Sequence, residues 1–212
     1  GTGADILTGG AGNDTFIVDG SDTVVELVGG GTDEVRTISN VVSIASFANV
    51  ENLTYTGSSN FTGTGNTAAN VITGAAGNDS LDGGAGIDTL VGGDGNDVYI
   101  IDAAGDLATE STGGGTDEAR TALASYTLAA NVENLTFTGT IGFTGTGNTL
   151  DNTLTSNAGN NALDGAGGSD TVSYAQASNS VNVSLYSGTA RGDGNDTLLN
   201  IENAVGGSFN DT

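Results

Sequence analysis

Aspartate returns at every ninth residue in the middle of the chain, at Asp79, Asp88 and Asp97, and an apolar residue stands two places after each of them. The same phase continues back to Asn70 and forward to Asp106. Repetition at so short and fixed an interval predicts a repeat fold, in which each short strand contributes one or two residues to the core.

Composition argues against an ordinary globular core. The 212 residues include 37 glycines but no Met, Trp, Cys or Pro, and only 5% are aromatic. Few large apolar side chains together with high net charge would normally indicate disorder. Val, Ile, Leu and Thr are nevertheless plentiful and fall at regular intervals, which again favours a repeat fold.

Each nine-residue unit has a simple physical logic, seen in the copy Gly83–Val91. Glycines permit positive φ and therefore a tight turn that brings backbone carbonyls inward. Asp88 ends the turn, and the next three residues form a short strand. The middle residue of that strand, Leu90, is expected to face the core.

The unit, Gly-Gly-x-Gly-x-Asp followed by x-apolar-x, resembles the repeat of the RTX family, and three tandem copies in register make the resemblance specific. It implies an all-β, right-handed parallel β-roll or β-solenoid with two nonapeptides per coil. It also implies several Ca²⁺ ions between stacked turns, held by aspartate carboxylates and by backbone carbonyls at the glycine positions. The predicted metal-site residues are Gly9, Ala11, Asn13, Asp14, Asp33, Asn70, Gly74, Ala76, Asn78, Asp79, Gly83, Ala85, Ile87, Asp88, Gly92, Asp94, Asn96, Asp97, Asp106, Asp117 and Asp170.

The charge of the chain favours the same ion. With 26 acidic residues, 3 arginines and no lysine or histidine, the formal net charge is −23. Carboxylates on coils stacked roughly 4.8 Å apart repel one another by about 1–3 kcal/mol per pair, so an unliganded ladder is expected to be unfolded or molten. Hard oxygen ligands without His or Cys select calcium over zinc or copper. The charge argues against nucleic acid or an anionic membrane surface as a partner.

The sequence also contains a second, longer repeat. Gly29–Thr37 recurs as Gly113–Thr121, and Asn49–Gly57 recurs as Asn131–Gly139, with offsets of 82 to 84 residues. We expect one continuous solenoid over residues 1–212. Its predicted parts are calcium-type repeats at 1–36 and 61–121, Thr/Asn-rich spacers at 37–60 and 122–142, degenerate repeats at 143–174, and a spacer with the start of a further repeat at 175–212.

Two features carry alternatives. In the degenerate series Asn152, Asn161 and Asp170, asparagine replaces two of three acids, which weakens a calcium site, so these turns could equally close without metal. Arg36 and Arg120 hold equivalent places in the long repeat; each could bind an anion, but we expect each to neutralise a neighbouring acid such as Glu34 or Glu118.

Catalysis has little support. Without His, Cys or Lys no Ser-His-Asp or Cys-His arrangement can be assembled, and the acids follow the repeat period. We therefore expect no enzyme here. No run of 18 apolar residues exists, so membrane insertion is not expected.

The predicted function is a calcium-binding structural segment of a secreted or cell-surface bacterial RTX protein, such as an adhesin or surface-layer component. The resemblance implies type I secretion followed by folding on extracellular calcium. Both ends fall inside a repeat unit, so we expect a segment of a longer chain. Further candidate partners are other copies of the chain and cell-surface glycans. The alternatives are the calcium-binding tail of a secreted hydrolase, lyase or toxin, and an ice-binding solenoid suggested by Thr62–Asn66 and Thr144–Asn148.

Overall fold

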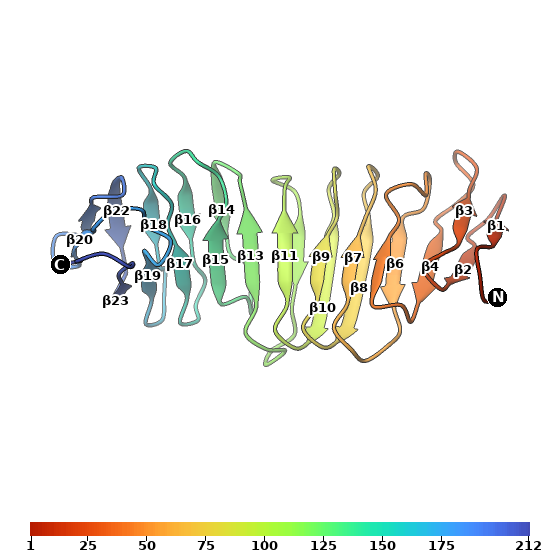
Figure 1. Cartoon of the computed structure of the whole chain (residues 1–212), viewed down its shortest axis with the longest axis horizontal. Helices are drawn as coiled ribbons and strands as arrows, with labels where there is room; N and C mark the ends of the chain where they lie inside the picture. Colours follow the sequence, from red (N-terminus) through yellow and green to blue (C-terminus); the bar gives the residue numbers. More distant parts are fainter. The chain divides into compact units, whose positions relative to one another are not determined.

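The strands are short and alternate inward and outward side chains, as a nine-residue unit requires. A computed structural model describes residues 1–212 and contains strands and turns but no helix. It comprises two compact units, Gly1–Gly115 and Thr116–Thr212. Figure 1 shows the short strands of each unit stacked side by side.

The first unit holds twelve strands in parallel sheets. One sheet pairs β1 with β3, a second has the order β12-β10-β8-β6-β4-β2, and a third contains β11-β9-β7-β5. The strands are β1 (Ile6–Thr8), β2 (Thr15–Val18), β3 (Thr23–Val25), β4 (Glu34–Thr37), β5 (Val41–Ser43), β6 (Asn52–Tyr55), β7 (Thr62–Thr64), β8 (Val71–Ala76), β9 (Ser80–Asp82), β10 (Thr89–Asp94), β11 (Val98–Ile101) and β12 (Leu107–Thr109).

The core of this unit is a pair of facing ladders of apolar side chains. On one side Leu53 pairs with Ile72 and Ile72 with Leu90, all completely buried. On the other side Leu81 pairs with Tyr99, also completely buried. Because each strand supplies only one or two inward residues, a single coil cannot bury its own core, and coils must stack to bury it.

The second unit follows the same plan, with one departure. Its sheets contain β23-β19-β17-β15-β13 and β14-β16-β18-β22-β21-β20. The strands are β13 (Glu118–Thr121), β14 (Ser125–Thr127), β15 (Asn134–Phe137), β16 (Thr144–Thr146), β17 (Thr153–Thr155), β18 (Ala162–Asp164), β19 (Thr171–Ser173), β20 (Asn182–Ser184), β21 (Thr189–Arg191), β22 (Asn195–Leu199) and β23 (Asn203–Val205). The departure is β21, which lies antiparallel to both β20 and β22.

A strand glycine lies beside a stacked aromatic pair at the end of each of the two Thr/Asn-rich spacers. The rings of Tyr55 and Phe61 stack at 4.7 Å in the first unit, and those of Phe137 and Phe143 stack at 4.0 Å in the second. A Cβ on Gly63 would lie 2.6 Å from the Phe61 ring, so the absence of a side chain there makes room for the ring. Aromatic volume thus fills the core where the nonapeptide pattern stops.

The all-β parallel solenoid predicted from the repeat is confirmed in both units. The arginine pairing is also confirmed, since Arg36 lies 2.9 Å from Glu34 and Arg120 lies 2.7 Å from Glu118. No helix with the length and hydropathy needed to cross a bilayer is present. A single continuous solenoid with the part boundaries given above stays a prediction.

Candidate metal sites

The aspartates that follow the nine-residue period hydrogen-bond from one coil to the next. Asp88 Oδ1 accepts the backbone N–H of Asn70 at 2.7 Å, and Asp97 Oδ1 accepts that of Asp79 at 2.7 Å. Asp106 Oδ1 in turn accepts the N–H of Asp88 at 3.1 Å. Each partner lies 18 residues earlier, as expected for two nonapeptides per coil.

The second oxygen of these carboxylates, Oδ2, indicates whether the site can bind a cation. The Oδ2 atoms of Asp79 and Asp88 are buried and accept no hydrogen bond. Asp170 repeats the arrangement, with Oδ1 accepting the N–H of Asn152 at 2.7 Å and Oδ2 buried without a partner. A desolvated carboxylate oxygen is costly unless something positive meets it, so these atoms indicate a bound cation.

The pKa values of the ladder acids move in the direction that such crowding requires. Burial, together with the charge of Asp97, raises the pKa of Asp79 to about 6. Burial and the charges of Asp106 and other nearby acids raise the pKa of Asp88. These shifts describe carboxylates that lack a cation, because a bound divalent ion would favour the charged form.

Glycine is required where the turn meets the carboxylate. A Cβ placed on Gly74 would lie 2.1 Å from Asp79 Oδ2, and one on Gly83 would lie 2.2 Å from Asp88 Oδ2. The backbone therefore borders the free oxygen directly, within the space that an ion and a carbonyl ligand would share. This geometry fits calcium, which takes both carboxylate and carbonyl oxygens.

The other predicted turn positions fall into three groups. Ala11, Ala85, Ile87, Asp94 and Asn96 have exposed side chains, so only their backbone oxygens could serve a buried ion. Asn13 and Asn78 form outer hydrogen bonds, Asn13 Oδ1 accepting the N–H of Thr32 at 3.0 Å and Asn78 Oδ1 that of Asn96 at 2.9 Å. The remaining turn positions with no side chain or a methyl group are Gly9, Ala76 and Gly92. Their role as ligands stays a prediction.

Two predicted ligands, Asn70 and Asp106, have side chains whose polar atoms already form hydrogen bonds with the backbone. The Asn70 amide donates to the carbonyls of Val50 and Glu51, both at 3.1 Å, and its Oδ1 accepts the N–H of Asn66 at 2.8 Å. Asp106 Oδ2 accepts the N–H groups of Asp102 and Ala103 at 3.1 and 2.9 Å.

Sequence reasoning missed a glutamate in each spacer whose carboxylate accepts a backbone N–H from another coil, as the periodic aspartates do. Glu51 Oε2 accepts the N–H of Asp33, Glu133 Oε2 that of Asp117, and Glu202 Oε2 that of Asp170, each at 2.8 Å. The signal was present in the sequence as Asn-Val/Ile-Glu-Asn, which occurs three times. The first Asn of each copy has positive φ, which bends the chain into the turn: Asn49 (61°), Asn131 (63°) and Asn200 (50°).

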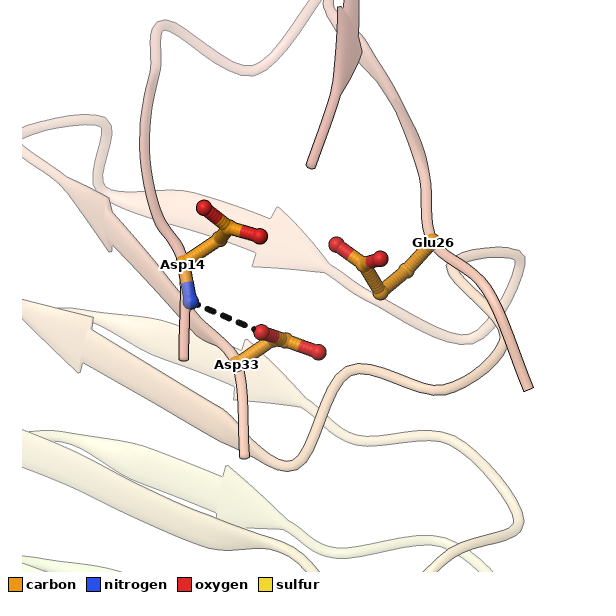
Figure 2. Close-up of side chains that lie close together, drawn as sticks. All are labelled: Asp14, Glu26 and Asp33. Atoms are coloured by element: carbon orange, nitrogen blue, oxygen red, sulfur yellow. Dashed lines mark hydrogen bonds between the residues drawn. The ribbon is translucent and has the colours of Figure 1, made fainter. Parts of the chain in front are cut away.

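One site near the N-terminus gathers three acids. Asp14, Glu26 and Asp33 each offer a carboxylate oxygen, and these oxygens lie within 4.8 Å of one another (Figure 2). Asp14 and Asp33 were predicted from the repeat, whereas Glu26 lies outside the nonapeptide motif and was missed.

The second unit also contains a ladder acid that is satisfied without metal. Asp196 Oδ1 accepts the N–H of Asn161 at 2.8 Å, and Oδ2 accepts the hydroxyls of Tyr174 at 2.8 Å and Ser156 at 3.2 Å. Burial raises the pKa of both Asp196 and Tyr174. This buried network replaces a cation with hydroxyl donors.

Comparison with known families agrees with this geometry. The sequence model of the RTX calcium-binding nonapeptide repeat matches in four copies, over residues 1–25, 64–99 and 146–180. No curated protein matches the chain. The matched segments include the turns around Asp14, Asp79, Asp88 and Asp170, whose second carboxylate oxygens lack a protein partner. Over these three segments the chain thus carries the calcium-binding nonapeptide repeat of the RTX family, within a fold of stacked parallel strands.

Proposed function

We propose that the chain is a structural module of a secreted or cell-surface bacterial RTX protein, of the adhesin or surface-layer kind, and that it folds on extracellular calcium. The observation that carries the proposal is the ladder of buried carboxylates, in which Oδ2 of Asp79 and Asp88 has no protein partner. Calcium binding energy then becomes folding energy, because the site exists only when coils are stacked.

The charge of the chain explains why it would fold outside the cell and not inside it. At a net charge of −23, a chain in a low-calcium cytoplasm meets unopposed repulsion between its coils and stays unfolded, as passage through a type I secretion system requires. External calcium at millimolar concentration is sufficient for weak extracellular sites. RTX repeat proteins are generally secreted, which supports an extracellular location.

We further propose that this segment has no catalytic role of its own. Its acids are used in coil-to-coil hydrogen bonds or face candidate ions, and His, Cys and Lys are absent from the sequence. Candidate partners beyond calcium are other copies of the chain, through exposed strand edges, and cell-surface glycans.

Far-UV circular dichroism in EDTA, followed by a calcium titration with a magnesium control, tests the proposal. We expect a cooperative gain of β signal with calcium and little with magnesium, which keeps its water and fits poorly between turns. Asp88→Asn should move the calcium midpoint upward by about tenfold or more, since it removes one ligand charge. Asp19→Asn is the matched control, because Asp19 is exposed and bonds only local groups and Gly3. A protein that is fully folded in EDTA would contradict the proposal.

A further inference from the structure

We propose that Asp14, Glu26 and Asp33 form a calcium site of a second kind, in which Glu26 supplies a third carboxylate that the nonapeptide does not contain. The inference rests on the proposed function only in taking the same ion. It assigns to Glu26, which lies on the loop between β3 and β4, a role as a metal ligand.

Glu26 is held in place for this role. Its Oε1 accepts the backbone N–H groups of Gly10 at 2.9 Å and Leu27 at 2.8 Å. Its Oε2 is buried and accepts no hydrogen bond, and the residue as a whole is only 8% exposed. One oxygen thus fixes the carboxylate, and the other is directed into the cluster (Figure 2).

Asp33 and Asp14 are arranged in the same way. Asp33 Oδ1 accepts the N–H of Asp14 at 2.8 Å, and Asp33 Oδ2 is buried with no partner in a residue that is 1% exposed. Asp14 Oδ2 is likewise buried and unpartnered. Three carboxylates from separate turns therefore present a free oxygen to one point, within 4.8 Å of each other.

The backbone at Gly9 and Gly30 closely borders these carboxylates. A Cβ on Gly9 would lie 2.0 Å from Glu26 Oε2 and 2.7 Å from Asp14 Oδ2, and one on Gly30 would lie 3.0 Å from Glu26 Oε1. Glycine at position 9 therefore leaves the carboxylate oxygens clear of any side chain from that turn. Three negative charges with hard oxygen donors select a divalent or trivalent cation of the calcium class.

No basic side chain is available to neutralise the cluster. The chain has no lysine, and the nearest arginine in sequence, Arg36, is paired with Glu34 at 2.9 Å. A divalent ion would leave this site with one negative charge. Because calcium affinity rises with the number of charged ligands, this site should bind more tightly than turns that present aspartates alone.

The test is Glu26→Gln, which keeps the shape and both anchoring hydrogen bonds but removes the charge. Calcium bound to the intact chain is counted by native mass spectrometry, and its affinity classes are measured by isothermal titration. We expect the variant to lose one ion from the tightest class, or to bind it about tenfold or more weakly. The matched control is Glu51→Gln, because Glu51 bonds the N–H of Asp33 and is not one of the three clustered acids.

The outcomes separate the two proposals. A Glu26→Gln protein with the same ion count and affinities as the parent overturns the Glu26 site while leaving the nonapeptide turns intact. A parent protein that binds no calcium overturns the proposed function itself. If Glu26→Gln does not fold, crystals of the parent soaked in terbium decide: an anomalous peak among the three carboxylates supports the site, and peaks only at other turns overturn it.

Discussion

The two oxygens of a periodic aspartate, such as Asp79, have different roles. Asp97 Oδ1 accepts the N–H of Asp79, and Asp79 Oδ1 accepts that of Phe61 at 2.8 Å, so the first oxygen sets the spacing between coils. The second oxygen is left to a cation, as the buried Oδ2 of Asp79 illustrates. The same side chain therefore contributes to the fold by hydrogen bonding and, under the proposed function, makes folding depend on an ion.

The raised pKa of Asp79, about 6 against an ordinary value of 3.8, predicts an unusual pH dependence of the metal-free protein. Burial favours the protonated form in the folded state, so folding takes up a proton. Stability from this source is complete below the unfolded pKa and is lost as the pH rises through the folded pKa. In EDTA, the free energy of unfolding should therefore fall between pH 4 and pH 6, in the window between 3.8 and about 6.

Far-UV circular dichroism in EDTA at several pH values measures this effect, as a residual β signal that should be larger at pH 4 than at pH 6. Asp79→Asn, which cannot titrate, should flatten the dependence in that window. With saturating calcium the trend should reverse, because protons then compete with the ion. A metal-free protein that gains stability steadily as the pH rises from 4 to 6 would contradict the prediction.

The turns close by two different chemistries. In the calcium-type turns a carboxylate leaves an oxygen for the metal, whereas the backbone carbonyls of the spacer turns accept hydrogen bonds from an amide side chain on the following coil. Asn66 donates to the carbonyls of Phe47 at 2.9 Å and Val50 at 2.7 Å, and Asn148 donates to those of Ala129 and Val132, both at 2.7 Å. The two N–H groups of a neutral amide thus take the place of a cation between coils.

Asn66→Ala should therefore destabilise the calcium-loaded protein. The substitution leaves two buried carbonyls and the N–H of Ala68 without their partner, which costs about 2–4 kcal/mol. The free energy of unfolding in urea at saturating calcium measures this loss. Asn60→Ala is the control, because Asn60 is exposed and water can replace its bond to Asn78, so its cost should stay below about 1 kcal/mol. Equal effects of the two substitutions would show that amide closure is not what holds the spacer turn.

We expect the two units to differ in how much of their structure depends on metal. The first has successive acids with free buried oxygens, at Asp79 and Asp88 among others. The second replaces several of them with Asn152, Asn161 and the Asp196 network, whose hydrogen bonds are complete within the protein. Because repeat proteins are stabilised coil by coil, the loss of calcium need not affect all coils equally.

Hydrogen exchange in EDTA should resolve this difference. We expect amides of β9 and β10, next to the free acids, to lose most of their protection, and amides of β17, β18 and β22 to retain more of it. In calcium both groups should be protected. Tyr174→Phe, which removes a donor to Asp196, should lower protection of β22 in EDTA. Equal loss of protection in both units without calcium would contradict this account.

The nine-residue period predicted the inward positions of Leu81, Leu90 and Tyr99. The resemblance of that repeat to the RTX family implied parallel coils whose acids face the next turn. These features follow from a local pattern, because the same short unit must bury the same position each time it stacks. Only the tertiary structure decided which oxygen of each acid is satisfied and where the pattern is broken. Glu26 lies outside the period and meets Asp14 only because a loop folds back, and Asp196 reaches Asn161 across 35 residues that include an antiparallel hairpin. Such contacts depend on how loops close between coils, and loop closure is not encoded in a repeating unit.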